Sequence, residues 1–256
     1  MRKQIHIIAR FTLIEALRTR LHWLMLSALL LAVVGSVFVH QIAIAENARI
    51  QTTFLAATMR FASVFIVSLY IISTMVREFN DKGLELMLSL ELPRAVYVLG
   101  RLAGFAAIAL LAAVLVSIPL LWLASPNEVA LWGASLWMEL LIVTALSLFA
   151  AVSFSQVMPA AAFVAAFYLL ARSITAIRLI SGTALLDELS PARRLMTLIA
   201  DGLALILPPL DSFAQTAWLV NAVGTWNDLT IVVAHSAAYV ALLAAAALFD
   251  FYRRNL

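Results

Sequence analysis

Residues 102–124 read LAGFAAIALLAAVLVSIPLLWLA, a run of 23 residues without one charged side chain. The hydrocarbon core of a bilayer is about 30 Å thick, and a helix of about 20 apolar residues crosses it. The run is long enough to make that crossing. It predicts that the chain passes through a membrane.

Five other apolar runs of similar length flank this one. Hydrophobic residues make up 64% of the 256 residues and charged residues 12%, with a mean hydropathy of +1.03, whereas soluble domains hold about 25% charged residues. We therefore predict an all-α integral membrane protein with one transmembrane domain over residues 1–256. The expected spans are Trp23–Ile44, Phe54–Val76, Leu102–Ala124, Leu131–Phe154, Ala160–Ile180 and Ile231–Phe249.

The orientation follows from the positive charges, because lysine and arginine near span ends stay preferentially in the cytoplasm. Six spans place both termini on one side. With the N-terminus inside, 11 of the 17 lysines and arginines face the cytoplasm, and 6 lie outside or within spans. Both termini are expected in the cytoplasm. The net charge of +3 is too small and dispersed for a nucleic-acid surface, and the absence of cysteine excludes disulfides and thiolate metal sites.

Residues 1–21 precede the first span and carry a helical pattern. Apolar residues recur at helical spacing while most charges fall elsewhere on the wheel. We expect a basic amphipathic helix along the inner membrane surface, although a plain cytoplasmic extension of the first span is the alternative. The apolar positions are Ile7, Phe11, Ile14, Leu17 and Leu21.

The cytoplasmic loop over residues 77–101 begins REFNDKGLELMLSLELPR. Residues 80–83 read as a turn, the following residues as a short leucine-rich helix, and Pro93 as the start of the next helix. Leu84, Met87 and Leu88 share one helical face. Either a partner protein or the membrane surface covers that face, or it packs against the chain's own span ends.

Two glycines lie where the third span begins. Gly100 and Gly104 form a small-xxx-small pair, which lets another helix approach closely. We expect a close helix contact at this point.

Residues 181–230 are partly apolar but repeatedly interrupted. Pro191 starts a helix that stops before Pro208-Pro209, too short to span. A second short helix is expected to begin at Asp211-Ser212, with Ser212 and Gln215 as a capping box. We interpret the region as two broken helices that re-enter the outer leaflet, with a pair of true spans as the alternative.

Catalytic and nucleotide-binding patterns are missing from the sequence. Neither G-x-x-x-x-G-K-[ST] nor G-x-G-x-x-G occurs, so we expect no ATP site in this chain. The four histidines lack metal-ligand spacing, and no serine sits in a nucleophile motif. We expect no bound cofactor, no metal and no enzymatic activity.

Three ionisable residues lie inside predicted spans, where charge is costly and often functional. By helical rise from the cytoplasmic ends, Arg60, Glu139 and Arg172 lie about 24, about 22 and about 20 Å deep. They occupy one layer, so Glu139 is expected to pair with Arg172 or Arg60 in the outer half of the membrane. The alternative is that each snorkels separately to the outer interface.

The order of these parts resembles the membrane subunit of type-2 ABC exporters, over nearly the whole chain. Arg77-Glu78, Gly83 to Ser89, Pro93-Arg94 and Tyr97 to Arg101 are similar to that family's E-x-x-x-G-T-x-x-x-L-L-S-x-P-x-S-R-x-x-x-x-x-G-K stretch. Leu84 replaces the usual threonine, and Leu92-Pro93-Arg94 compresses the proline–serine–arginine part. An outer segment also looks like that of permeases similar to the nitrous-oxide-reductase maturation permease; it contains Leu207, Pro208, Pro209, Leu210, Asp211, Ser212 and Phe213.

The resemblance implies a coupling helix over Glu78 to Leu92, held in a groove of a separate cytoplasmic ATPase. Two ATPase subunits would bind ATP and Mg, and a second permease copy or a homologous permease would complete the exporter in a bacterial inner membrane. The apolar face would anchor the joint, and the charged residues would orient it. The implied coupling residues are Glu78, Gly83, Leu84, Glu85, Met87, Leu88, Pro93 and Arg94.

Two other functions fit parts of the pattern. The chain could transmit ATP-driven motion through Ser181 to Thr230 to a periplasmic protein, without moving a substrate. It could also be an ion-driven secondary transporter, a class that usually contains internal repeats, and no convincing repeat is found here.

Overall fold

The computed structural model describes residues 2–19, 21–43, 46–80, 93–182 and 191–253. These residues form nine α-helices and two short 3-10 helices, and they contain no strand, so the all-α prediction is confirmed. The elements are α1 (Arg2–Arg18), α2 (Leu21–Ile42), α3 (Asn47–Asn80), α5 (Arg94–Ser117), η1 (Pro119–Trp122), α6 (Pro126–Phe154), α7 (Val157–Gly182), α8 (Pro191–Ile206), η2 (Leu210–Ser212), α9 (Thr216–Asn221) and α10 (Trp226–Arg253).

Six helical segments are long and apolar enough to cross a membrane, in agreement with the six predicted spans. They indicate a multi-pass membrane protein. The helices continue past the apolar runs, because polar residues extend α3 down to Asn80 and α5 back to Arg94. The segments are Leu21–Ile42, Asn47–Asn80, Arg94–Trp122, Pro126–Phe154, Val157–Leu179 and Trp226–Arg253.

Helix α6 forms the centre of the bundle and packs against α3, α5, α7 and α10. It starts with a capping box between Ser125 and Glu128, and Pro126 stands in its first turn, where the missing N–H is harmless. Most of its side chains are buried on all sides. Polar residues on α6 therefore face other helices.

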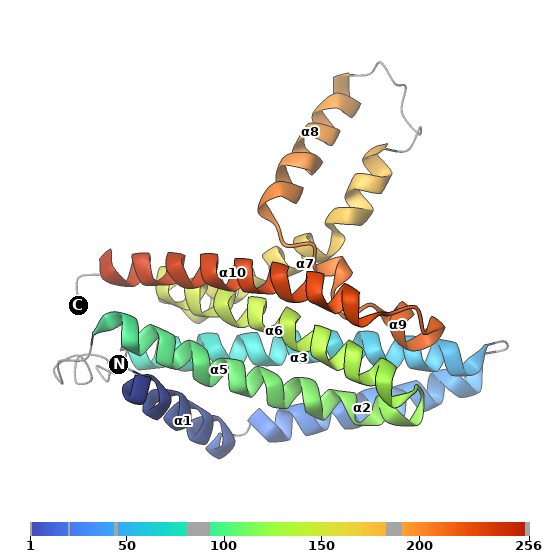
Figure 1. Ribbon diagram of the computed structural model, residues 1–256, viewed down its shortest axis with the longest axis horizontal. Coiled ribbons are helices and arrows are strands. Elements are labelled where there is room, and N and C mark those ends of the chain that lie inside the picture. The colour runs from blue at the N-terminus through green and yellow to red at the C-terminus, as the bar shows by residue number, and fades with distance from the viewer. Residues whose placement is uncertain (1, 20, 44–45, 81–92, 183–190, 254–256) are drawn as a thin grey trace.

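Helix α1 lies against α5 at the two glycines identified in the sequence. A Cβ atom on Gly100 would lie 2.8 Å from Ile8 Cβ, and one on Gly104 would lie 2.6 Å from Thr12 Cβ. The expected close contact is present, with α1 as the neighbour. Figure 1 shows the two described chain ends, in α1 and α10, at the same end of the bundle as the end of α3 and the start of α5.

The second half of α7 leaves the bundle and, together with α8, projects from its side (Figure 1). Pro208-Pro209 then stops α8, and the chain bends by 67° between Thr197–Ile206 and Leu210–Asn221. The bent pair is apolar enough to count as one broken span or a re-entrant loop. Pro191, where a helix start is predicted, is the first described residue of α8, because residues 183–190 lie outside the described part of the chain.

The capping box predicted at Ser212 and Gln215 is wrong. Ser212 Oγ donates a hydrogen bond back to Pro209 O at 2.7 Å, which closes the 3-10 turn η2. Helix α9 begins only at Thr216, after Gln215, whose side chain makes no capping bond. The two prolines favour a tight turn before the helix, and this turn uses the hydroxyl that would have capped it.

Candidate functional site

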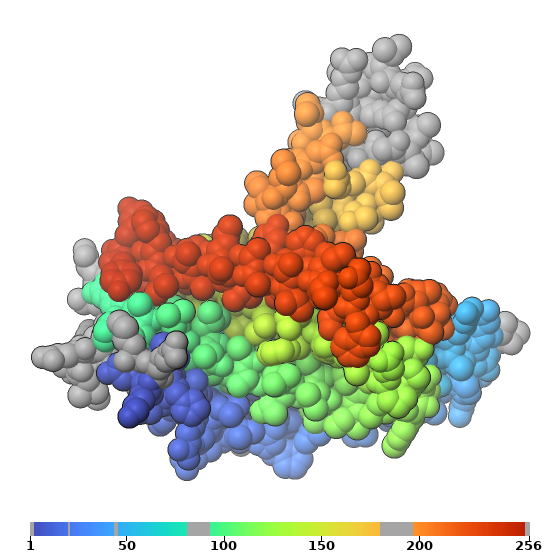
Figure 2. All heavy atoms as spheres, viewed as in Figure 1, coloured from blue at the N-terminus to red at the C-terminus, as the bar shows by residue number. Residues whose placement is uncertain are grey.

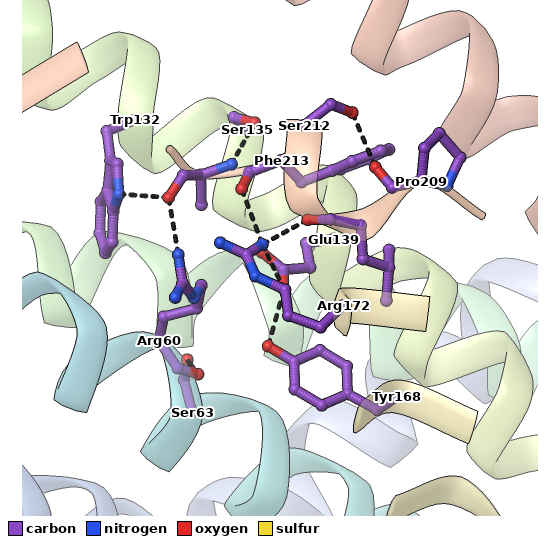
Figure 3. Close-up of polar contacts among 12 residues, drawn as sticks. Arg60, Ser63, Trp132, Ser135, Glu139, Tyr168, Arg172, Pro209, Ser212 and Phe213 are labelled. Carbon is purple, nitrogen blue, oxygen red and sulfur yellow. Dashed lines mark hydrogen bonds and ion pairs between the residues drawn. The ribbon is translucent and has the colours of Figure 1, made fainter. Parts of the chain in front are cut away.

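Four polar side chains, three of them buried and Arg172 partly buried, meet midway along the bundle and define the Glu139 cluster: Arg60 of α3, Glu139 of α6, and Tyr168 and Arg172 of α7 (Figure 3). Glu139 is 0% exposed and Arg60 is 6% exposed. Ionised groups lose several kcal/mol of hydration at such a position, so each needs partners inside the protein.

Glu139 has two of these partners on α7. Tyr168 Oη donates to Glu139 Oε1 at 2.8 Å, and Arg172 Nη1 lies 3.6 Å from the same oxygen. The second carboxylate oxygen, Oε2, accepts no hydrogen bond from the described part of the chain. Phe61 and Phe65 meet the Tyr168 ring edge-on, with centroids 6.0 and 6.1 Å away, which positions its hydroxyl.

The arginines of the cluster also bind backbone carbonyls that the break at Pro208-Pro209 leaves outside any α-helix. Arg172 Nη1 donates to Leu210 O and, at 2.9 Å, to Phe213 O. Arg60 Nη1 donates to Ala214 O at 2.9 Å. A non-helical backbone is tolerated at membrane depth only where protein or water satisfies it. The two arginines do this for the segment 207–215.

Ala214 of that segment is bonded to three side chains of α3 and α6. Its carbonyl also accepts from Trp132 Nε1 at 3.0 Å, and its N–H donates to Ser135 Oγ at 2.9 Å. Its φ of 43° lies in the left-handed region, which costs an L-residue about 1–2 kcal/mol. Three helix side chains, from Arg60, Trp132 and Ser135, offset this strain.

The three charges predicted to share one layer do meet here. Of the two pairings expected for Glu139, the structure contains the one with Arg172. Arg60 is turned into the bundle towards Ala214, and its burial is incompatible with snorkelling to an interface. In the outer segment, Pro208 and Pro209 make the break, Asp211 and Ser212 lie in η2, and Phe213 is fully buried.

A second ionic group, the Arg101 cluster, lies at the end of the bundle that holds the described chain ends. Arg101 of α5 is 4% exposed and binds two carboxylates, Glu78 of α3 and Glu15 of α1, the latter at 3.0 Å. Arg101 also donates to Thr12 Oγ1 at 3.2 Å, and Arg77 Nη2 lies 3.6 Å from Glu15. One guanidinium therefore joins α1, α3 and α5.

The predicted coupling loop is described only at its two ends. Glu78 points into the bundle towards Arg101, and Arg94 Nη1 donates to Phe251 O and Tyr252 O, each at 3.2 Å. Pro93 precedes α5 and is exposed. The other coupling residues lie outside the described residues: Gly83, Leu84, Glu85, Met87 and Leu88.

Sequence reasoning missed several residues that complete these clusters. Arg101 lies within the stretch that resembles the exporter family, and Glu15 is one of the charges of the first helix, but neither position in the sequence indicates their ion pair. Tyr168 interrupts an otherwise apolar run, which was a usable signal. Ala214 carries no such signal, because alanine rarely marks a left-handed backbone.

The described residues contain no group of three or more histidine, aspartate or glutamate side chains that could hold a metal. An apolar groove of about 350 Å³ runs between α5 and α6, lined by residues such as Leu110, Val114 and Trp137. A groove of this lining suits hydrocarbon and offers nothing to a polar solute.

The two clusters connect helices through ion pairs and hydrogen bonds that can form and break. One cluster lies at the end of the bundle and the other at its middle. No protein-family model matches the sequence, and no curated protein does.

Proposed function

We propose that this chain is the permease subunit of an ATP-driven ABC exporter in a bacterial inner membrane. Separate cytoplasmic ATPase subunits would bind ATP and Mg, and this chain would convert their closure into movement of its spans. The observation that carries the proposal is the Arg101 cluster, which ties the two helices flanking residues 81–92 to the N-terminal helix.

A coupling segment needs rigid ends, because movement of a loosely held loop changes only the loop and does not move the spans. The end of α3 is held by Glu78 on Arg101, and the start of α5 by Arg94 on the last turn of α10. Movement of residues 81–92 would thus reach α1, α3, α5 and α10 together. In this role Glu78 and Arg94 hold the joint from the permease side.

Helix α1 fits the same proposal as the helix on the inner membrane surface. Thr12 and Ala16 face the protein, while Ile7, Phe11 and Leu17 are exposed. An exposed apolar stripe next to basic residues suits the boundary between headgroups and acyl chains. Through Glu15, this helix would sense the same movement as the spans.

The leucine face of residues 84–91 tests the proposal. Leu88→Asp places a charge on the face expected to enter the ATPase groove, and the permease should then no longer co-purify with its ATPase from detergent-solubilised membranes. Leu86→Asp is the matched control, since position 86 falls on the opposite side of the expected helix and should keep the ATPase bound. Both variants should reach the membrane in wild-type amounts. Co-purification of Leu88→Asp at the wild-type level would contradict the proposal.

The Glu139 cluster favours a second candidate, ATP-driven mechanical transmission to a periplasmic protein without cargo. Arg60 and Arg172 attach the segment 207–215 to α3 and α7, so movement of these spans would be passed to α9. Asn221→Cys at the end of α9 provides the test. ATP-dependent change in the reactivity of this thiol towards a water-soluble maleimide supports transmission, and a constant rate contradicts it.

A further inference from the structure

The arm, defined as residues 172–182 of α7 together with α8, projects from the side of the molecule (Figure 2), while Arg172 and Ile174 at its base remain packed in the bundle. Within the described chain, α8 packs mainly on α7. Large apolar side chains on it are exposed, among them Leu198, Leu205 and Ile206. Lipid could cover these side chains as well as a protein could.

An ion pair on the arm is different, because lipid cannot cover it. Arg178 Nη2 lies 2.9 Å from Asp201 Oδ1, and the two side chains are 53% and 61% exposed. Arg178 follows Arg172 of the Glu139 cluster by about 9 Å of helix. Figure 1 shows the arm leaving the side of the bundle and running steeply away from its long axis, from which we infer that the pair stays near the level of the spans. Charged groups at this level need protein or water around them.

Helix α10, which passes beneath the arm in Figure 1, presents a second polar group on an apolar span. His235 is exposed there, in the outer half of the helix as oriented above. Ile231 and Leu242 are the exposed side chains closest to it around the helix, and a row of exposed alanines runs beside them, where small side chains let a neighbouring helix approach closely. These alanines are Ala234, Ala237, Ala238, Ala241 and Ala245.

We propose that the arm of one copy of this chain packs on the α10 face of a second copy. The carboxylate of Asp201 complements the imidazole of His235, and the leucines of α8 cover the alanine face. Both halves of the contact lie on one chain, so a two-fold arrangement covers both arms and both faces at once.

This interface deepens the proposed function, since it gives the surface by which the second permease copy binds. The contact itself involves no ATPase. It can therefore be tested on the chain expressed alone, and its failure can be told apart from failure of the ATPase coupling.

The chain contains no cysteine, so the introduced cysteines are the only thiols in it that a maleimide can modify. Two differently tagged copies, one with Leu198→Cys and one with Ala238→Cys, are co-expressed and treated in membranes with a short bismaleimide. The matched control replaces Leu198→Cys by Leu31→Cys on α2, since the two leucines are 73% and 72% exposed. We expect several-fold more cross-linked heterodimer with Leu198→Cys. Equal yields from the two combinations would overturn the interface.

The polar contact has its own test in the same cysteine background. Asp201→Ala or His235→Ala should lower the cross-linking yield several-fold, whereas an arm that simply lies in lipid would cross-link no differently. Ready labelling of Asp201→Cys by an impermeant maleimide, together with absent cross-links, would place the arm in water and overturn the proposal. If the cross-links are absent but the ATPase still co-purifies, this interface is contradicted and the proposed function is not.

Discussion

The Arg101 cluster and the Glu139 cluster are both built around buried arginine, but their acceptors differ. Arg101 binds the side-chain carboxylates of two neighbouring helices. In the Glu139 cluster only Arg172 pairs with the carboxylate, and both arginines of the cluster donate to backbone carbonyls at a chain break. The first cluster depends on side chains alone, and the second depends on the unwound shape of the segment 207–215.

This difference indicates how the helices can move at the end of the bundle and at its middle. Rotation of Glu15 or Glu78 would open the Arg101 cluster while every helix stays intact. The Glu139 cluster can open only if the segment 207–215 changes its backbone or leaves α3 and α7. We therefore expect sliding between helices at the end of the bundle and joint movement of the broken segment with the spans at its middle.

The largest expected effect comes from Arg101→Leu. Glu15 and Glu78 would be left partly buried without their shared cation, and the free energy of unfolding should fall by about 3–5 kcal/mol. Unfolding by SDS in mixed micelles, followed by circular dichroism, measures it. Arg101→Lys keeps the charge and should lose less. A fall below about 1 kcal/mol would mean that the carboxylates find water easily.

Glu139→Leu comes next, at about 3 kcal/mol, because Arg172 loses its ion pair and the buried Tyr168 hydroxyl loses its acceptor, while both arginines keep their carbonyl acceptors. The same SDS titration measures the change. Glu139→Gln separates charge from hydrogen bonding, since an amide oxygen can still accept from Tyr168. If both variants were as stable as wild type, the backbone carbonyls alone would suffice for the arginines, and the comparison between the clusters would fail.

A smaller effect is expected from Gly104→Ala, which acts on the Arg101 cluster through packing. The new Cβ atom would lie 2.6 Å from Thr12 Cβ and 3.0 Å from Ala9 O, so α1 must shift, at about 1–3 kcal/mol. Gly202→Ala is the control in α8, because nothing lies within 4 Å of its Cβ position. It should be neutral or stabilising by about 0.5–1 kcal/mol. Equal effects of the two changes would contradict the close α1–α5 contact.

The smallest effect is expected at the pair between Arg49 and Glu46. Its atoms are 3.3 Å apart, but both side chains are more than half exposed. Glu46→Ala should change the free energy of unfolding by less than about 0.5 kcal/mol in the same titration. A larger loss would show that exposure is a poor guide to the strength of ion pairs in this protein.

Much of the fold follows from the apolar runs, because lipid forces each run of sufficient length into a helix. The common layer of Arg60, Glu139 and Arg172 also follows, since helical rise converts residue number into depth. The partners of Arg101 could not be found in this way, because α1 reaches α5 only through tertiary packing. The helix start at Thr216 was missed because the hydroxyl of Ser212 bonds backwards to Pro209.

The hydrogen bond from Ala214 N–H to Ser135 has a consequence for hydrogen–deuterium exchange. Most amides in the segment 207–215 bond to carbonyls two to four residues away, so their protection reports only on local turns. The amide of Ala214 is bonded to a side chain of α6 instead. Its exchange rate therefore reports, at a single position, how often the broken segment separates from the central helix.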